Sequence, residues 1–316
     1  MAEVIATKQK KKNRLLASLL ERVSRTQQWL LTDPELAAER DVASKLPATP
    51  QPDHTAKAQT PTTEYWRTDA PGLDELLWGE GWAVPLGEHM TTVMVRAFGL
   101  NKEMSVLDLT GGLGGSGAMI VEAFGSYVTA LEADTELAAR GVHYLKQKSA
   151  AHHATLESYA PEKFLAKRRF DGIIARELFY RMADKPALVA EIAKSLKDYA
   201  HLSWTDLVLA DPVADEAALQ PWLKAEIAGT RPLRLAEVEP LWTKNRVELR
   251  VSEDRTGHYI DAVEGSLAKL VRVLQGQTVA PETKQLILSR VEFWAQRVNA
   301  FNHGLRFYRF YGTKRG

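Results

Sequence analysis

A carboxylate, a glycine-rich turn and a second carboxylate follow one another between residues 105 and 132. Asp108 lies in a short apolar stretch, and residues 111–115 read GGLGG. A helical pattern comes next, and a second apolar stretch ends on Glu132. Glycines let a backbone pass close to a ligand, and the start of a helix offers free N–H groups. A carboxylate at the end of the neighbouring strand accepts hydrogen bonds from ribose hydroxyls. The stretch therefore predicts a nucleoside-binding site.

Two kinds of ligand fit this turn. Gly112, Gly114 and Gly117 match the G-x-G-x-x-G pattern of dinucleotide sites, with an acid on the next strand. Asp108 argues against that interpretation, because a pyrophosphate gains nothing from a nearby carboxylate. S-adenosylmethionine carries a cationic amino-acid end and no phosphate, so a carboxylate at the end of the first strand suits it.

The segment VLDLTGGLGG, residues 106–115, resembles motif I of the class I S-adenosylmethionine-dependent methyltransferases, whose pattern is acid-x-Gly-x-Gly-x-Gly. This chain departs from the pattern once, with a threonine at the first glycine. Residues 170–180 resemble the family's fourth motif, which touches the methyl donor and acceptor, and a glutamate follows the third strand where the family has an acid that faces adenine. The resemblance implies S-adenosylmethionine as cofactor, in contact with Asp108, Thr110, Gly112, Gly114, Glu132, Glu157 and Arg176.

Three further segments resemble small-molecule methyltransferases, those acting on phosphoethanolamine, sterols or quinones. They read LLWGEGWAVPLG (76–87), ARELFYR (175–181) and EDRTGHY (253–259). Arg181 stands where phosphoethanolamine enzymes have a histidine that helps to deprotonate the amine, so the resemblance implies the architecture and not the substrate. The catalytic candidates are Tyr180, Arg176 and His258, with Trp82, Asp206 and Asp254 as further candidates for the acceptor pocket.

Repeated strands and helices must position these residues. Apolar stretches separated by helical patterns predict a Rossmann-like α/β sheet, mostly parallel, with helices on both faces. The final strand alternates aromatic and basic residues, as an exposed edge strand can, and the resemblance implies that it runs antiparallel. Strands are predicted at 106–109, 127–131, 154–156, 170–175, 201–209, 246–251 and 304–311. Thr135 is predicted to cap one helix, and an aspartate and a proline at 184 and 186 predict the start of another. Later helices are predicted at 216–227, 235–242 and 281–300.

The chain divides by composition into three parts. Residues 1–46 predict a helical extension that begins with a cluster of lysines, and residues 47–63, rich in proline and threonine, predict a linker. Residues 64–316 predict the methyltransferase domain, with lid or cap elements at 64–90 and 212–245. A basic amphipathic helix can lie on anionic lipid, bind a protein partner or mediate self-association, besides packing on its own domain.

Composition limits the other function classes. The 316 residues carry a net charge of +1, which gives no electrostatic reason to expect nucleic acid as a partner. Without cysteine the chain has no disulfide or cysteine metal site, and the sequence predicts a cytoplasmic protein without a metal. In-line methyl transfer needs positioning more than covalent help, so the lack of a Ser-His-Asp set does not count against an enzyme. Methyl transfer to a nitrogen or oxygen of a small molecule is the leading hypothesis. An NAD(P)-dependent oxidoreductase and a non-catalytic, methyltransferase-like interaction protein are the alternatives.

Overall fold

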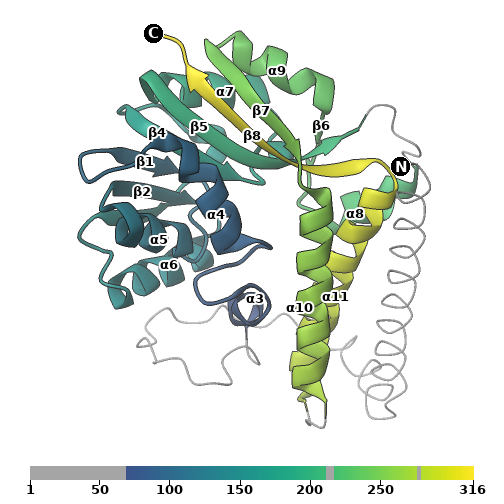
Figure 1. The fold of residues 1–316 in the computed structure, drawn as a ribbon. Coiled ribbons are helices and arrows are strands. Elements are labelled where there is room, and N and C mark those ends of the chain that lie inside the picture. Colours follow the sequence, from purple (N-terminus) through teal and green to yellow (C-terminus); the bar gives the residue numbers. More distant parts are fainter. Residues whose placement is uncertain (1–68, 211–216, 276–278) are drawn as a thin grey trace, which may run out of the picture.

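Eight strands form one sheet in the computed structural model, which describes residues 69–210, 217–275 and 279–316. The strand order is β3-β2-β1-β4-β5-β8-β7, and β6 pairs with β5 beyond that path (Figure 1). Strands β1 to β5 pair in parallel, and β8 is antiparallel to both of its neighbours. The predicted fold class is therefore confirmed, including the antiparallel last strand. The strands are β1 (Ser105–Asp108), β2 (Tyr127–Glu132), β3 (Ala154–Ser158), β4 (Phe170–Arg176), β5 (Leu196–Leu209), β6 (Leu233–Arg234), β7 (Val247–Asp254) and β8 (Leu305–Lys314).

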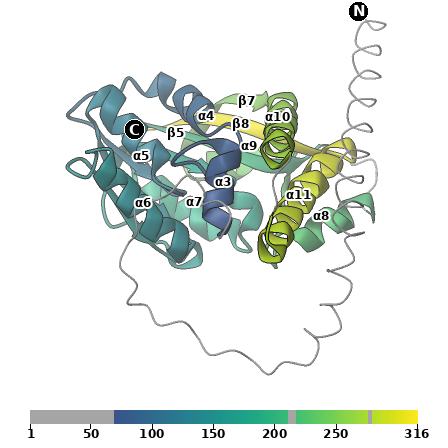
Figure 2. The ribbon, with the colours of Figure 1, turned by 90° about the horizontal axis from the view of Figure 1, so that it is seen from below.

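Helices cover both faces of the sheet because neighbouring residues of its central strands point in opposite directions. Ile174 of β4 enters a core with α3, α4, α5, α6, α10 and α11, whereas Ile173 enters a second core with α7 and α9. Figure 2, seen from below, looks onto the face that is covered by α3, α5, α6, α10 and α11. The helices are α3 (Ala70–Trp78), α4 (Gly87–Val95), α5 (Gly115–Phe124), α6 (Thr135–Gln147), α7 (Lys185–Lys194), α8 (Gln220–Ala225), α9 (Leu235–Thr243), α10 (Thr256–Leu274) and α11 (Pro281–Asn302), with the 3-10 turns η2 (Arg96–Phe98), η3 (Pro161–Lys163), η4 (Phe179–Arg181) and η5 (Ala217–Leu219).

Aspartate caps fix where the helices after β2 and β4 begin. The Asp134 side chain accepts hydrogen bonds from two backbone N–H groups in the first turn of α6, at 2.8 and 3.1 Å. Asp184 caps α7 through the N–H of Ala187 at 3.0 Å, and a proline lies in its first turn. The sequence predicted the start of α7 correctly. It placed the cap of α6 one residue late, on Thr135.

The final strand is not at the edge of the sheet, contrary to the prediction. Strand β8 lies between β5 and β7, and β7 forms the edge. The aromatic side chains of Phe307 and Phe310 are buried on the two faces, one in each core. The basic residue between them is compatible with an interior strand because Arg309 pairs with Glu253 of β7 at 3.4 Å.

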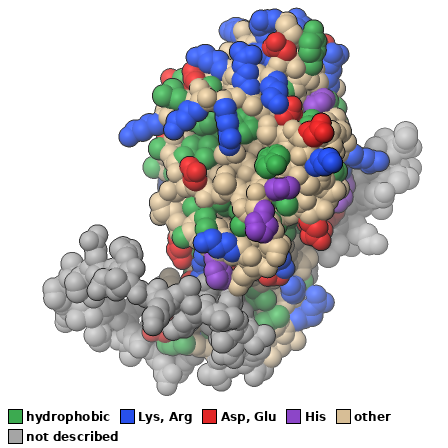
Figure 3. Space-filling model, turned by 90° about the vertical axis from the view of Figure 1, so that its left-hand side faces the viewer, with side chains coloured by type: hydrophobic (Ala, Val, Ile, Leu, Met, Phe, Trp, Pro, Cys, Tyr) green, Lys and Arg blue, Asp and Glu red, His purple; other side chains and the backbone are tan. Residues whose placement is uncertain are grey.

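Helices α10 and α11 run side by side and extend beyond the sheet (Figure 1). Tyr259 of α10 and Trp294 and Phe301 of α11 are buried together, and α3 packs on the inner side of the pair. Lysine and arginine side chains gather on the upper part of the face in Figure 3, with acidic side chains among them. Within the part of the chain that is described, no helix is long and apolar enough to cross a membrane.

The predicted N-terminal helical extension (1–46) and linker (47–63) lie outside the described residues, together with residues 64–68 of the predicted lid and 212–216 of the predicted cap. The division of the chain into these parts stays a prediction. So do the lipid, protein and self-association partners of the basic helix.

Candidate active site

A cavity of about 450 Å³ opens at the edge of the sheet where β1, β2 and β4 end. In parallel α/β sheets ligands bind outside the carboxyl ends of the strands. The walls are mainly apolar, with a few charged groups. The described residues that line the cavity include Gly81, Trp82, Thr110, Gly112, Leu113, Glu132, Leu137, Tyr159, Pro161, Glu162, Arg176, Glu177, Arg181, Met182, Ile227 and Ala228.

The glycine turn and Glu132 form one hydrogen-bonded unit. Gly112 has φ +53°, a backbone conformation that favours glycine, and its N–H donates to Glu132 Oε2 at 2.7 Å. The other carboxylate oxygen of Glu132 accepts from the N–H of Asp134 at 2.9 Å. Each oxygen keeps a second lone pair for a ligand. Burial raises the pKa of Glu132, and these two backbone donors oppose the shift. The carboxylate is therefore held in a fixed position at the cavity wall.

Gly114, a predicted cofactor contact, serves packing instead. It does not line the cavity, and a Cβ there would lie 2.9 Å from the carbonyl oxygen of Gly141 in α6. Its φ of +87° also lies in the region that favours glycine. The third glycine position of the motif therefore allows α5 and α6 to approach each other closely.

Asp108 does not face the cavity, contrary to the expectation that it meets a ligand cation. Its side chain is fully buried, and one oxygen lies 3.3 Å from an Arg176 Nη2 and accepts a hydrogen bond from Ser116 Oγ. The other oxygen accepts from the N–H of Thr110 at 2.9 Å. The guanidinium of Arg176 thus lies next to Asp108, where the sequence predicted the cation of the ligand.

Thr110 has a structural reason to replace the glycine of the motif. Its Oγ1 accepts a hydrogen bond from the backbone N–H of Arg176 at 2.8 Å, which links the end of β1 to the end of β4. Arg176 also donates to the Thr110 carbonyl at 3.0 Å and to Thr91 Oγ1 at 2.6 Å. Both predicted cofactor contacts line the cavity, and the arginine is held by residues of three different elements.

Residues 81–84 form part of the cavity wall, where the sequence predicted a lid. The N–H of Gly115 donates to the carbonyl of Gly81 at 3.0 Å, which fixes this segment to the start of α5. The Trp82 ring lies 5.4 Å from the Arg176 guanidinium and is only 8% exposed. The indole therefore shields this end of the cavity from water.

The segment after β4 supplies the opposite wall. Glu177 has φ +51°, an uncommon conformation for a residue with a side chain, and its carboxylate pairs with Arg297 of α11 at 2.5 Å. Arg181 follows in η4, and its Nε donates to the Tyr180 hydroxyl at 2.7 Å. The end of β4 and the turn η4 are therefore held in place by a network of buried side chains.

Arg297 is the centre of that network, and its side chain is completely buried. It donates to Glu226 Oε1 from Nε at 2.9 Å, to the Tyr259 hydroxyl at 2.7 Å and to the Tyr180 hydroxyl at 2.9 Å. Sequence reasoning missed this residue. The available signal was an arginine within an apolar helical face, since Trp294, Val298 and Phe301 are buried at helical spacing around it.

Besides Asp108 and Gly114, three more predicted site residues lie outside the cavity lining. Tyr180 is fully buried, and its hydroxyl donates to Glu226 at 2.9 Å, so it supports the wall from behind. His258 is exposed on α10, because the helix turns that position away from the core. Glu157 is exposed because it alternates with the buried Leu156 on β3, and the cavity is lined there by Tyr159 instead.

Asp206, a further acceptor-pocket candidate, is also absent from the lining. It is buried in β5 and accepts from the N–H of Tyr180 at 3.2 Å. Burial raises its pKa to about 8, so the carboxyl is mostly protonated near neutral pH. Asp254 is exposed and accepts a backbone hydrogen bond from Thr256 at 2.8 Å. Among the described residues no group of histidine, aspartate or glutamate side chains is placed to hold a metal ion.

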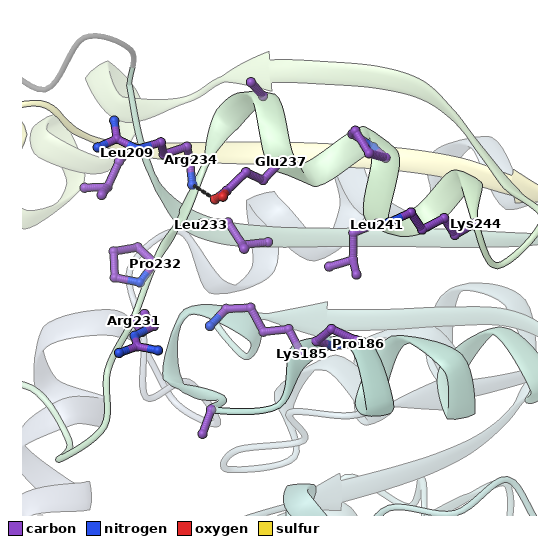
Figure 4. Close-up of a pocket in the computed structure, with 13 residues that line it drawn as sticks. Lys185, Pro186, Leu209, Arg231, Pro232, Leu233, Arg234, Glu237, Leu241 and Lys244 are labelled. Atoms are coloured by element: carbon purple, nitrogen blue, oxygen red, sulfur yellow. Dashed lines mark hydrogen bonds between the residues drawn. The ribbon is translucent and has the colours of Figure 1, made fainter.

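A second groove, of about 600 Å³, lies between α7, β6 and α9 (Figure 4). Lys185 and Lys244 line it, and the Arg234 N–H donates to Glu237 at 2.8 Å across its upper side. Lys185 is 3% exposed, its ammonium donates to the Met182 carbonyl at 2.6 Å, and burial lowers its pKa. No predicted site residue lines this groove.

No model of a known protein family matches the sequence, and no curated protein matches it. Solved structures do match. Phosphoethanolamine N-methyltransferase 2 from Haemonchus contortus, in complex with phosphomonomethylethanolamine and S-adenosylhomocysteine, is similar with a TM-score of 0.66 at 17% identity, over 80% of this chain and 59% of that chain. The chain has the fold of the class I methyltransferases.

Other solved structures with this fold have different reactions in their names. The cyclopropane synthase MmaA2 from Mycobacterium tuberculosis is similar with a TM-score of 0.58 at 16% identity, over 72% of this chain and 83% of that chain. The cyclase SpnF is similar with a TM-score of 0.57 at 14% identity, over 72% of this chain and 81% of that chain. At such identities the fold alone is shared, and the reaction must be argued from the site.

Proposed function

We propose that this chain is an S-adenosylmethionine-dependent methyltransferase with a small-molecule acceptor. One observation carries the proposal. The Glu132 carboxylate is held at the end of β2 by the N–H of the glycine turn, and it lines a cavity at the carboxyl edge of the sheet. This arrangement presents two acceptor oxygens to a ribose, next to a backbone that a ligand can approach.

The described residues fit the adenosyl part of the cofactor. Glu132 would accept from the ribose hydroxyls, and Leu113, Leu137, Tyr159 and Pro161 supply an apolar wall for a base. The sequence predicted that Asp108 meets the cationic amino-acid end of the cofactor. Asp108 is instead paired with a buried arginine, so it is not available to that end. When bound, the cofactor supplies a methyl group on a sulfonium. Thr110 and Arg176 are joined by hydrogen bonds that link the end of β1 to the end of β4. In our proposal both residues line the cofactor end of the cavity.

The chain's own contribution is positioning and exclusion of water, which suffices for an in-line displacement. Trp82 shields one end of the cavity, and the segment from Glu177 to Met182 forms the other wall over the buried network. Arg297 holds that wall through Glu177, at 2.5 Å. The site is therefore preorganised on both sides of the place where donor and acceptor would meet.

The test is methyl transfer from S-adenosylmethionine labelled in its methyl group to a panel of small amines, phenols and carboxylic acids. Label in an organic product that depends on the protein and on one acceptor class supports the proposal. Binding of NAD in place of S-adenosylmethionine would support the oxidoreductase alternative. If S-adenosylmethionine binds but no acceptor is methylated, the chain is a methyltransferase-like scaffold.

A further inference from the structure

Arg181 brings an unpaired guanidinium to the cavity. Its Nε donates a hydrogen bond to the Tyr180 hydroxyl at 2.7 Å, and the Tyr180 ring centre lies 5.1 Å from the guanidinium carbon. Among the described residues no carboxylate forms an ion pair with Arg181, and its two terminal nitrogens have no hydrogen-bond partner. Arg181 thus carries four N–H donors without a partner in a planar fork, and it lines the cavity.

The nearby carboxylates form their ion pairs with Arg297 and not with Arg181. Glu177 pairs with Arg297 at 2.5 Å, and Glu226 accepts from Arg297, from Trp222 at 2.8 Å and from the Tyr180 hydroxyl. Their charges act on Arg181 without forming an ion pair, and its terminal N–H groups remain for a ligand. An anionic group is the natural partner for such a fork.

The described residues that line the cavity include no histidine or lysine, and their carboxylates are Glu132, Glu162 and Glu177. Glu162 is exposed in η3, beside Pro161 of the apolar wall assigned to the base of the cofactor. Burial raises the pKa of Tyr159 far above its ordinary value, and its hydroxyl donates to the Leu109 carbonyl at 2.7 Å. Glu132 accepts two backbone hydrogen bonds at the cofactor end, and Glu177 is held by Arg297. The acceptor must therefore arrive as a nucleophile.

A carboxylate meets both conditions. It is ionised near neutral pH and needs no base, whereas an aliphatic amine is mostly protonated there and is repelled by a guanidinium. Beside the arginine, Met182, Ile227 and Ala228 offer an apolar surface to the rest of an acid. A carboxylate has about four lone pairs, so an oxygen bound by arginine still has one free for attack.

We propose that the acceptor is a small carboxylic acid with an apolar body, held through its carboxylate by Arg181 and methylated on oxygen to an ester. The inference rests on the proposed function and names its substrate class. The carboxylate oxygen bonds to the methyl carbon while the carbon–sulfur bond breaks and its electron pair moves to sulfur. The products are a neutral ester and a thioether, and no proton is taken up or released.

Calorimetry on the full chain tests the proposal. The probes are S-adenosylhomocysteine, then hexanoate, benzoate, hexanamide and hexylamine added to the protein saturated with it. At least one acid should bind to the wild type and the amide and amine should not. Arg181→Gln should weaken acid binding about 10- to 100-fold, the range for charge-assisted hydrogen bonds, and leave S-adenosylhomocysteine within about threefold. Arg181→Lys should retain part of the affinity. Arg231→Gln, in the second groove, is the matched control.

Several results would overturn the proposal. One is that neither acid binds the saturated wild type, and another is that Arg181→Gln binds an acid as well as the wild type does. A third is that Arg181→Gln weakens S-adenosylhomocysteine but not 5′-methylthioadenosine, which lacks the amino-acid carboxylate. Arg181 would then hold the cofactor. A wild type that does not bind S-adenosylhomocysteine at all would instead refute the proposed function.

The product gives a second readout. With an acid acceptor the transferred label should be released as volatile methanol on mild alkaline treatment, because methyl esters hydrolyse and methyl ethers or amines do not. Label that stays in an alkali-stable product would contradict ester formation while leaving methyl transfer itself intact.

Discussion

Replacing Arg297 by methionine should destabilise the fold strongly. The substitution keeps much of the apolar length of the side chain but removes the only cation that the described structure places within ion-pair distance of both Glu177 and Glu226. Burial alone would raise the pKa of Glu226, and the charge of Arg297 holds it below its ordinary value. Breaking a buried ion pair from one side costs about 3–5 kcal/mol, because the remaining charge stays buried.

The assay is urea unfolding near neutral pH, followed by tryptophan fluorescence and circular dichroism. Arg250→Met is the matched control, since Arg250 pairs with Glu248 at 3.0 Å on the surface and is 54% exposed. We expect the control to lose less than about 1 kcal/mol. Adding Glu226→Gln to Arg297→Met should recover part of the loss, because one uncompensated charge is removed.

A loss below about 1 kcal/mol for Arg297→Met would refute this reasoning. So would a double variant that is as unstable as the sum of the two single changes. Either result would mean that the carboxylates do not depend on Arg297 for their compensation.

Two further predictions concern buried carboxyl groups. The pKa of the Asp206 carboxyl is ordinarily 3.8, and burial raises it to about 8, so the folded state binds the proton more tightly than the unfolded state does. The free energy of unfolding should therefore fall as pH rises between these two values, by up to about 1.4 kcal/mol per pH unit. Asp206→Asn should flatten that slope in urea unfolding measured at several pH values, and an unchanged slope would contradict the assignment. Asp108→Asn should lower stability by about 3 kcal/mol or more, because it leaves Arg176 buried without its partner. It should leave calorimetric binding of 5′-methylthioadenosine within about threefold, and selective loss of that binding in a stable variant would show that Asp108 faces the ligand.

The sequence predicted the parts of the fold that local patterns determine. The apolar strand, the glycine turn and the acid at the end of β2 lie within 28 residues, so their relation follows from one β-α-β unit. The aspartate and proline before α7 marked its start for the same reason.

What the sequence did not reveal depends on contacts between distant segments. Asp108 meets Arg176 across 68 positions, and Glu177 meets Arg297 across 120, so neither partner could be found from spacing. The interior position of β8 depends on β7 pairing outside it, which no pattern within residues 304–311 could show. Tyr180, a predicted catalytic residue, does not line the cavity, because its hydroxyl is directed to the buried network, a property of side-chain packing.

The central claim is that Glu132 at the end of β2 binds the ribose of S-adenosylmethionine. Calorimetric titration of S-adenosylhomocysteine into the wild type, Glu132→Gln and Glu136→Gln tests it most directly. Glu136 is exposed in the first turn of α6 and serves as the control. We predict binding by the wild type and the control, and an affinity about 10- to 100-fold weaker for Glu132→Gln, since a charged hydrogen-bond acceptor is lost. No binding by the wild type, or equal affinity in all three proteins, would contradict the account.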